Sequence, residues 1–416
     1  MSILQSQDPQ LHLATLHEEL RQLHGMELIA SENYVSPAVL EAMSSVFTNK
    51  YSEGYPGKRY YGGQEYVDIV ESMAIDRAKS LFGCKYANVQ PLSGSPANLA
   101  VYFALLQPGD TVLGLALDHG GHLSHGHPVN ASGILYKFTQ YTVEKDTGRI
   151  DMNKVREIAR REKPKLILAG FSAYSRGLDW KEFKSIADEV GAYTMADIAH
   201  IAGLVAGKAI DTPVGIFDVV TTTTHKTLRG PRGALIMTDS EDLAKKIDRA
   251  IFPGMQGGPH IPQIVAKAVA FGEALRPSFG TYAKNVIVNA QRLATKLQDK
   301  GFTVISGGTD NHLLVVDMTS KGLSGKESEK LFDEVGISSS RSTIPYDPRK
   351  PLDPSGVRLG SAAVTTRGFG IEQIDFIADV LDRAVQAKGN EGKLASIKAE
   401  VSALCCQYPL FAPLKD

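Results

Sequence analysis

The residue best placed for covalent chemistry is Lys226, which follows a run of valine and threonine, Val219–Thr223, and precedes a glycine- and proline-rich loop. Valine and threonine favour extended backbone, so the run predicts a buried strand that stops at His225 and Lys226. A lysine at the mouth of such a strand is partly desolvated, which lowers its pKa and makes its amine a nucleophile toward carbonyl carbon. The alternative is a solvated lysine beyond a strand end, the more frequent case for a lone lysine.

Two further segments fit a ring that carries both a nitrogen and a phosphate. Asp197 ends another apolar run, and a buried carboxylate there needs a positive partner, such as the protonated nitrogen of pyridoxal phosphate. The sequence also predicts a helix that is capped by Ser95 and begins at Pro96. The free N–H groups of its first turn, next to Ser93 and Gly94, suit a phosphate. A structural salt bridge and a plain helix cap are the alternatives.

An arginine and a glutamate suit an amino-acid substrate. Arg358 stands between apolar residues after a proline-rich loop, and its planar fork of donors matches an α-carboxylate. Glu53 lies among Tyr51, Tyr60 and Tyr61 in a segment with few helix signals. A carboxylate among aromatic rings is suited to acid–base work, and the alternative is a polar surface loop.

Four histidines within nine residues, His119, His122, His125 and His127, look like a metal-binding run. The run is interrupted by glycine, contains no cysteine and lacks the helical i, i+4 spacing of a zinc motif. We therefore expect no metal. A histidine stacked on a flat cofactor ring explains one of the four.

The composition is typical of an ordinary globular protein, with 43% hydrophobic and 22% charged residues in a chain of 416. The formal net charge of −1 favours neither a nucleic acid nor an anionic membrane as partner. The three cysteines, Cys84, Cys405 and Cys406, have no disulfide or metal spacing, and the sequence predicts no role for the last two. No secretory signal or membrane-length apolar run is recognisable, so we expect a cytoplasmic protein.

The elements that must position these residues fall into three parts. The first 25 or so residues predict an amphipathic helix that packs on a second subunit or on its own domain. Residues 30–63 predict an irregular, functional segment. Between residues 65 and 258, short strands alternate with helices, which predicts a parallel or mixed sheet covered on both faces. Ligands of such sheets bind at the carboxyl ends of the strands, where Asp197 and Lys226 lie.

The expected strands of this sheet are residues 111–115, 165–169, 193–196, 219–223 and 234–237, and the expected helices are residues 68–82, 153–161 and 180–190. After residue 280 the pattern predicts a smaller α+β domain. Its expected elements are a hairpin of residues 302–306 and 312–318, a helix over 326–335 and a last helix over 371–388.

Together these segments resemble serine hydroxymethyltransferase, a pyridoxal-phosphate enzyme of fold type I. The resemblance extends from about Glu27 to Arg367, and its motifs are ELIASEN at 27–33, YSEGYPGKRYYGG at 51–63, HGGHL at 119–123, TTTTHK at 221–226 and GGTDNH at 307–312. It implies an α/β fold with a large, mixed, mostly parallel seven-stranded sheet and a smaller C-terminal α+β domain. The implied parts are an N-terminal arm and active-site segment (1–60), a cofactor domain (61–280) and a small domain (281–416).

The resemblance also implies a role for each candidate residue. Lys226 would hold pyridoxal phosphate covalently, Asp197 would pair with its ring nitrogen, and His122 would stack on the ring. The other implied cofactor contacts are His200 and Ser172 near the ring oxygen, and Ser93, Gly94, Ser95 and His225 at the phosphate, with Tyr51 and Gly258 supplied by a second subunit. The implied substrate contacts are Ser31 and Arg358 for the carboxylate, Glu53 and Tyr61 at the hydroxymethyl group, Thr223 near the lysine, and Leu117, Gly121, Leu123, Tyr60 and Ser342 for the folate.

The implied reaction is the reversible conversion of serine and tetrahydrofolate to glycine and 5,10-methylenetetrahydrofolate, by a homodimer with shared active sites or a pair of such dimers. Two departures concern the folate site. Ser340-Arg341-Ser342 replaces a common Asn-Lys-Asn run, and Asp118 stands where a small apolar residue is usual. They predict weaker folate use and motivate one alternative, a folate-independent aldolase or transaldolase acting on α-methylserine or threonine. The other alternative, a non-catalytic binding paralogue, is disfavoured because Lys226, Asp197 and Arg358 are all present.

Overall fold

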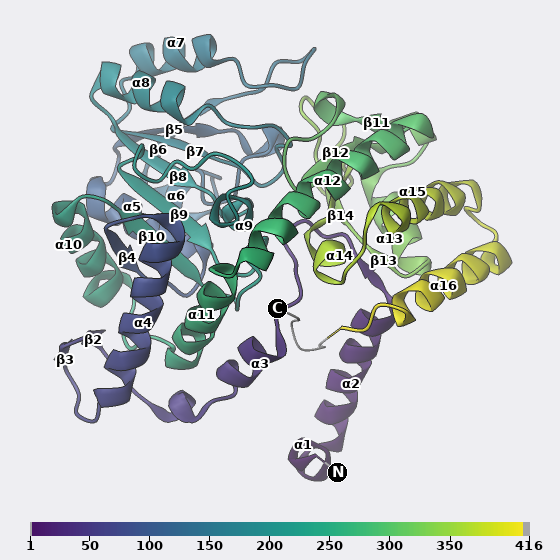
Figure 1. The fold of residues 1–416 in the computed structure, drawn as a ribbon. Helices are drawn as coiled ribbons and strands as arrows, with labels where there is room; N and C mark the ends of the chain where they lie inside the picture. The colour runs from purple at the N-terminus through teal and green to yellow at the C-terminus, as the bar shows by residue number, and fades with distance from the viewer. Residues whose placement is uncertain (1, 411–416) are drawn as a thin grey trace.

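The computed structural model describes residues 2–410 of the 416-residue chain. Its centre is a seven-stranded sheet in the order β4-β10-β9-β8-β7-β5-β6 (Figure 1). Neighbouring strands are parallel except for β10, which runs antiparallel to both β4 and β9. The strands are β4 (Tyr86–Asn88), β5 (Thr111–Leu115), β6 (Lys137–Tyr141), β7 (Leu166–Gly170), β8 (Tyr193–Asp197), β9 (Val219–Thr223) and β10 (Ala234–Thr238). The prediction of a mixed, mostly parallel sheet is confirmed.

Helices cover both faces of this sheet. In β7, Leu166 and Leu168 enter one hydrophobic cluster while Ile167 and Ala169 enter another on the opposite face. The inner strands therefore bury both sets of their side chains, which is why their sequences are apolar without alternation. The edge strands β4 and β6 are more exposed. The helices that pack on one face are α5 (Gly94–Leu105) and α10 (Glu241–Arg249), and those on the other are α4 (Glu65–Phe82), α7 (Met152–Glu162), α8 (Trp180–Val190), α9 (Ala202–Ala206) and α11 (Ile261–Ala274).

The smaller body is built on a four-stranded antiparallel sheet in the order β11-β12-β15-β14. Its elements are β11 (Thr303–Val304), β12 (Leu313–Asp317), β14 (Ser340–Ser342), β15 (Gly356–Gly360), α13 (Gly325–Glu334), α14 (Ala362–Thr366), α15 (Ile371–Gln386) and α16 (Glu391–Cys406). The long helix α12 (Pro277–Asp299) joins the two bodies, since Phe279 and Val286 pack in the large-domain cluster and Leu293 and Leu297 in the small-domain cluster. The division of the chain at residues 60 and 280 stays a prediction.

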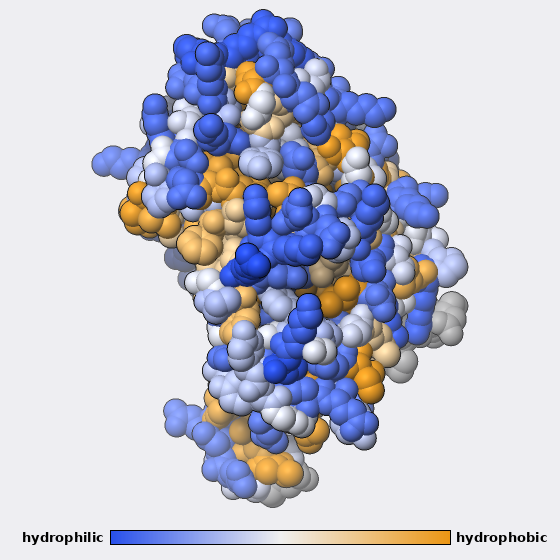
Figure 2. All heavy atoms as spheres, turned by 90° about the vertical axis from the view of Figure 1, so that its left-hand side faces the viewer, coloured by the Kyte–Doolittle hydropathy of each residue, from blue (hydrophilic) through white to orange (hydrophobic). Residues whose placement is uncertain are grey.

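The N-terminal segment begins with α1 (Ile3–Gln7) and α2 (Pro9–His24), which project from the small domain (Figure 1). No residue of α2 is buried, and its leucines Leu11, Leu13 and Leu20 are each more than a third exposed. The lowest lobe in Figure 2 is this arm, with hydrophobic side chains at its surface. Of the two expectations for the arm, packing on its own domain is therefore wrong along most of its length.

After the arm, β1 (Met26–Glu27) pairs with β13 (Ile337–Ser338) of the small domain. The segment of residues 30–63 is less irregular than expected. It holds α3 (Pro37–Met43), the 3₁₀ turn η1 (Val46–Asn49) and a hairpin of β2 (Gly54–Tyr55) and β3 (Lys58–Arg59). An ion pair attaches the hairpin to α4. Arg59, whose side chain is 3% exposed, pairs with the buried Glu71 at 2.5 Å.

The helix that was expected to be the last one, over residues 371–388, corresponds to α15 and is followed by one more helix. The chain turns at Gly389, which has a positive φ of 80°, and Asn390 caps a further helix, α16. The remaining short elements are η2 (Leu117–His119), α6 (Ala131–Leu135), η3 (Ala250–Met255), η4 (Ile305–Gly307) and η5 (Met318–Lys321). Within residues 2–410, no helix has the length and apolar character needed to cross a membrane. The cytoplasmic location stays a prediction.

Candidate active site

Lys226 lies just beyond the carboxyl end of β9, where all five strand residues are buried. The lysine is only 8% exposed, and its backbone carbonyl accepts a hydrogen bond from Asn33 Nδ2 at 2.9 Å. Burial lowers the pKa of Lys226 to about 8, against the opposing attraction of Asp197, and nearby Arg358 and Arg232 lower it further. A pKa this low leaves a much larger fraction of the amine as the free base near neutral pH than an ordinary lysine has, and covalent chemistry on a carbonyl requires the free base.

Asp197 ends the neighbouring strand β8 and is 8% exposed. Its Oδ2 accepts hydrogen bonds from Asn98 Nδ2 at 2.8 Å and His125 Nε2 at 3.0 Å, and its Oδ1 accepts one from Ala199 N at 3.0 Å. Burial opposes ionisation, but the hydrogen bonds and charges around it hold the pKa of Asp197 well below its usual range. The site therefore keeps a buried carboxylate, which suits a protonated ring nitrogen.

Two of the residues that hold Asp197, His125 and Asn98, were missed by the sequence reasoning. The backbone N–H of His122 donates to His125 Nδ1 at 3.3 Å, so the proton of His125 is on Nε2 and points at Asp197. The histidine run carried the only signal for His125, and Asn98 gave none, since it lies one helical turn into α5.

His122 lies beside this pair. Its Nδ1 lies 2.7 Å from Ser124 Oγ, and burial together with His125 lowers the pKa of His122 to about 4. His122, His125 and Asp197 also form the one group within residues 2–410 whose spacing could hold a metal ion. A hydrogen bond already accounts for the His125–Asp197 contact, and the expectation of no metal stays a prediction.

The N-terminus of α5 forms an anion-binding turn. The helix begins at Gly94 with Ser93 as its N-cap, so the prediction of a cap at Ser95 and a start at Pro96 is wrong. Proline is tolerated throughout the first turn, where no N–H has an intrahelical acceptor. The Ser93 side chain makes no capping bond, which leaves the first N–H groups open to a ligand. A Cβ on Gly94 would come within 2.9 Å of Thr223, so the turn lies against the end of β9.

His225 stands beside the same region with an unsatisfied ring. Its side chain is partly buried, and its Nδ1 has no hydrogen-bond partner in the described chain. Burial lowers the pKa of His225 to about 3, so the free ring is neutral and can donate to an anion. An orphaned polar atom of this kind indicates a missing ligand.

Arg358, on β15, approaches from the small domain. Its Nη1 donates to the carbonyl of Ser172 at 2.7 Å and its Nη2 lies 3.5 Å from Ser31 Oγ, while its Nε has no partner in residues 2–410. Burial lowers the pKa of Arg358 to about 10. No carboxylate of the described chain forms a salt bridge with it, so the guanidinium is free to bind an incoming carboxylate.

His200 completes this group. It is 2% exposed, and burial together with the charges of Lys226 and Arg358 holds its pKa well below its usual range. His122 feels the same two cations. The structure thus gathers the following predicted residues into one site: Lys226, Asp197, His122, His200, Ser172, Ser93, Gly94, Ser95, His225, Thr223, Ser31 and Arg358.

A second group of predicted residues lies around the β2–β3 hairpin, at the lower left of the large domain in Figure 1. Tyr51 donates from its hydroxyl to Glu53 Oε1 at 3.2 Å, its ring is 5.0 Å from that of Tyr61, and a Cβ on Gly258 would come within 3.2 Å of it. Tyr51 and Tyr61 are about half exposed and Tyr60 is 74% exposed. No hydrogen bond or ion pair within residues 2–410 joins this group to the first.

The predicted folate contacts are divided as well. Leu117 and Leu123 flank His122, and Gly121 beside it has no room for a Cβ, which would lie 2.2 Å from the Leu115 carbonyl. Ser342 belongs to β14, two residues beyond the position that pairs with Arg358.

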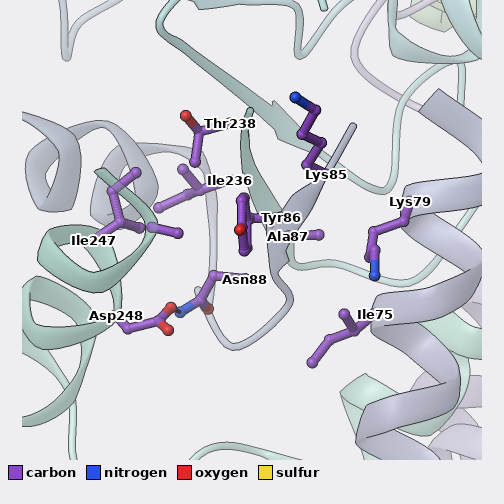
Figure 3. A pocket seen from close by; sticks show the side chains of 11 residues that line it. Ile75, Lys79, Lys85, Tyr86, Ala87, Asn88, Ile236, Thr238, Ile247 and Asp248 are labelled. Carbon is purple, nitrogen blue, oxygen red and sulfur yellow. Dashed lines mark hydrogen bonds between the residues drawn. The ribbon is translucent and has the colours of Figure 1, made fainter. Parts of the chain in front are cut away.

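Of two cavities in the described chain, only the second is lined by predicted site residues. The cavity in Figure 3, about 170 Å³, lies between β4, β10, α4 and α10 and is lined by residues such as Tyr86 and Asp248. It contains none of the predicted residues. A wider groove of about 760 Å³ is lined by Ser31 and His225 of the site and by Glu18 and Gln22 of the arm. The groove therefore runs from the site to the exposed face of α2.

A comparison with protein families agrees with this geometry. The family model described as serine hydroxymethyltransferase matches residues 4–381 of the chain. The match contains both groups of predicted residues and every helix and strand of the large domain.

Proposed function

This chain belongs to the serine hydroxymethyltransferase family, and we propose that it converts serine and tetrahydrofolate reversibly to glycine and 5,10-methylenetetrahydrofolate. The family makes it a pyridoxal-phosphate-dependent transferase. The observation that carries the specific proposal is the guanidinium of Arg358, which has no acidic partner in the described chain and lies close enough to Lys226 to lower the pKa of its amine. That pair suits an α-amino acid, whose carboxylate and amino group both need a partner.

The residues present fit pyridoxal phosphate. The open first turn of α5 and the orphaned Nδ1 of His225 would hold the phosphate, Asp197 would hold the ring nitrogen, and Lys226 would hold the aldehyde carbon. When bound, the cofactor withdraws electrons from the bonds at the substrate's α-carbon.

The remaining chemistry belongs to the side chains. Asp197 stays ionised, because His125 and Asn98 donate to it, and would therefore keep a proton on the ring nitrogen of the bound cofactor. Arg358 and Ser31 orient the carboxylate, His122 covers the ring, and the amine of Lys226 moves protons near the α-carbon. Glu53 and Tyr61 would act on the hydroxymethyl group, and tetrahydrofolate would bind along Leu117, Gly121, Leu123, Tyr60 and Ser342.

We further propose a homodimer that shares its active sites. Three observations support it: the apolar face of α2 is exposed, a groove connects it to the site, and the exposed Tyr51–Glu53 group makes no described hydrogen bond or ion pair with the residues around Lys226. A second copy that covers the arm would bring its own Tyr51, Glu53 and Gly258 to the first copy's lysine. A twofold axis makes the exchange reciprocal.

Mixing two inactive variants tests this exchange. We expect Lys226→Ala and Glu53→Ala to be inactive alone, and to recover about a quarter of wild-type serine cleavage after subunits are mixed by dilution and reassembly. Half of the random dimers are hybrids, and each hybrid holds one site with both native residues. Reassembled Lys226→Ala alone is the matched control. Recovery no greater than in that control would mean that Glu53 acts within its own subunit.

A second candidate function rests on the small-domain side of the folate site. Ser342 donates its hydroxyl to the carbonyl of Thr343, which leaves no free donor for a pterin, and Asp118 is an exposed carboxylate 3.8 Å from His119 Nε2. Both features support weak folate binding. They favour a folate-independent aldolase or transaldolase that acts on α-methylserine or threonine.

Serine cleavage by the cofactor-loaded protein, with and without tetrahydrofolate, separates the two functions. We expect folate to accelerate serine cleavage strongly, with a folate KM that Ser342→Asn lowers by up to about tenfold, since one hydrogen bond contributes about 0.5–1.5 kcal/mol. α-Methylserine and threonine are cleaved in parallel. Slow, folate-indifferent serine turnover with brisk cleavage of either analogue would overturn the proposal in favour of the aldolase.

A further inference from the structure

His312 joins three parts of the molecule behind the site. It lies directly before β12, is fully buried, and its backbone carbonyl accepts a hydrogen bond from Ser361 N at 2.9 Å. Its ring Nε2 lies 3.2 Å from His200 Nδ1 and 3.2 Å from the carbonyl oxygen of Ala30. Its other ring nitrogen, Nδ1, is buried and has no partner in the described chain.

These contacts fix the proton of His312. A carbonyl oxygen can only accept, so the contact with Ala30 requires a hydrogen on His312 Nε2. The ring is neutral, because burial and the charges of Arg358 and Lys226 lower the pKa of His312 to about 3. The single hydrogen is then on Nε2, and the orphaned Nδ1 is a lone pair. That assignment avoids a buried N–H without an acceptor, the rarer and costlier fault.

The proton of His200 follows from that of His312. His200 Nδ1 faces the same Nε2–H at 3.2 Å, so it must be the acceptor. A neutral His200 therefore carries its hydrogen on Nε2. That nitrogen makes no hydrogen bond within residues 2–410, on a side chain where Lys226 and Arg358 both exert their charge.

We propose that His312 is a positioning residue that keeps the proton of His200 on Nε2, so that His200 donates to the ring oxygen of the bound cofactor. This inference rests on the proposed function, which puts His200 beside that oxygen. The role needs a donor at the position of Nε2 rather than a ring of this size. A residue that only fills space would be replaced equally well by phenylalanine, whereas the proposal needs a group that donates to both Ala30 and His200.

The direct test is the tautomer of His200 in cofactor-free protein labelled with ¹⁵N-histidine. Long-range ¹H–¹⁵N correlation spectra distinguish the two neutral tautomers, and His200→Asn assigns the signal. We expect His200 to carry its hydrogen on Nε2 in the wild type and in His312→Gln, whose carboxamide nitrogen replaces the donor. In His312→Phe we expect a mixture of tautomers. A wild-type His200 protonated on Nδ1, or a His312→Phe spectrum identical to the wild type, would overturn the inference.

Kinetics of the loaded enzyme give a second readout. We expect His312→Phe to lower kcat for serine by roughly tenfold to a hundredfold with little change in KM, since misplacing one group costs on this scale. His312→Gln should recover most of the loss. Equal loss in both variants would indicate a packing role. The tautomer is measured without substrate, so a wild-type enzyme that fails the folate test leaves this readout intact, and the two proposals fail separately.

Discussion

Lys226→Ala is expected to lower steady-state serine cleavage by at least roughly 10⁴-fold, the scale on which losing a covalent-catalysis residue is measured. Two properties of this lysine underlie the expectation. The charges of Asp197 and Arg358 both act on it, and burial lowers the pKa of its amine to about 8. No neighbouring lysine can take over the covalent bond to the cofactor.

The same substitution should leave the fold intact and change how stability depends on pH. Burial lowers the pKa of Lys226 from 10.5 to about 8 in the cofactor-free protein. The unfolded chain therefore binds this proton over a range in which the folded chain has released it. Stability rises with pH across that range, and the cost of the buried ammonium is complete below the folded pKa. The stability of Lys226→Ala relative to the wild type should thus decrease from about pH 7 to about pH 10.

Thermal unfolding of the two cofactor-free proteins at these two pH values measures this difference. Lys245→Ala, at an exposed position on α10, is the matched control and should change neither turnover nor the pH trend. Sustained multiple turnover by purified Lys226→Ala would remove the lysine from the mechanism. A circular dichroism spectrum unlike the wild type would show instead that the residue is needed for folding.

Local patterns in the sequence were enough for the five inner strands of the large sheet, but the edge strands β4 and β6 were missed because most of their residues are not buried and their sequences are not continuously apolar. The β-branched run Val219–Thr223 and the apolar run ending at Asp197 became adjacent buried strands, β9 and β8, with both reactive residues at the same edge. This follows because the carboxyl ends of parallel strands meet at one edge. The position of Arg358 beside them came from the resemblance, since nothing near residue 358 in the sequence indicates which strand it faces.

What the sequence could not provide were contacts between distant residues and the limits of helices. Asn98 and Asp197 are in contact although 99 positions separate them in the sequence, and 112 positions separate His200 from His312. No local pattern can therefore predict either contact. Helix α12 was missed because its two halves pack in different hydrophobic clusters, which blurs any single apolar face. The start of α5 was misplaced by two residues because serine and proline are both acceptable at several places in a first turn.

Arg358→Ala should have the second largest effect, on the amino acid rather than on the folate. The side chain of Arg358 is partly buried, and the only described hydrogen-bond partners of its guanidinium are a carbonyl and a hydroxyl, so a substrate carboxylate would be its first full countercharge. Truncating one partner of a buried charged pair costs about 2–5 kcal/mol. Serine affinity should therefore fall by roughly 30-fold to several-thousand-fold. Glycine should lose affinity by a similar factor, because both amino acids present the same carboxylate.

Arg358→Lys separates charge from geometry in this prediction. Lysine keeps the positive charge but loses the planar fork that also reaches the Ser172 carbonyl, so we expect an intermediate loss of serine affinity. Equilibrium titration of serine and glycine, followed through the visible absorbance of the bound cofactor, measures the loss independently of turnover. Tetrahydrofolate KM should stay within a few-fold of the wild type in both variants. Unchanged kcat and KM for serine in Arg358→Ala would mean that another residue binds the carboxylate. Arg358 would then have only a structural role, through its contact with the Ser172 carbonyl.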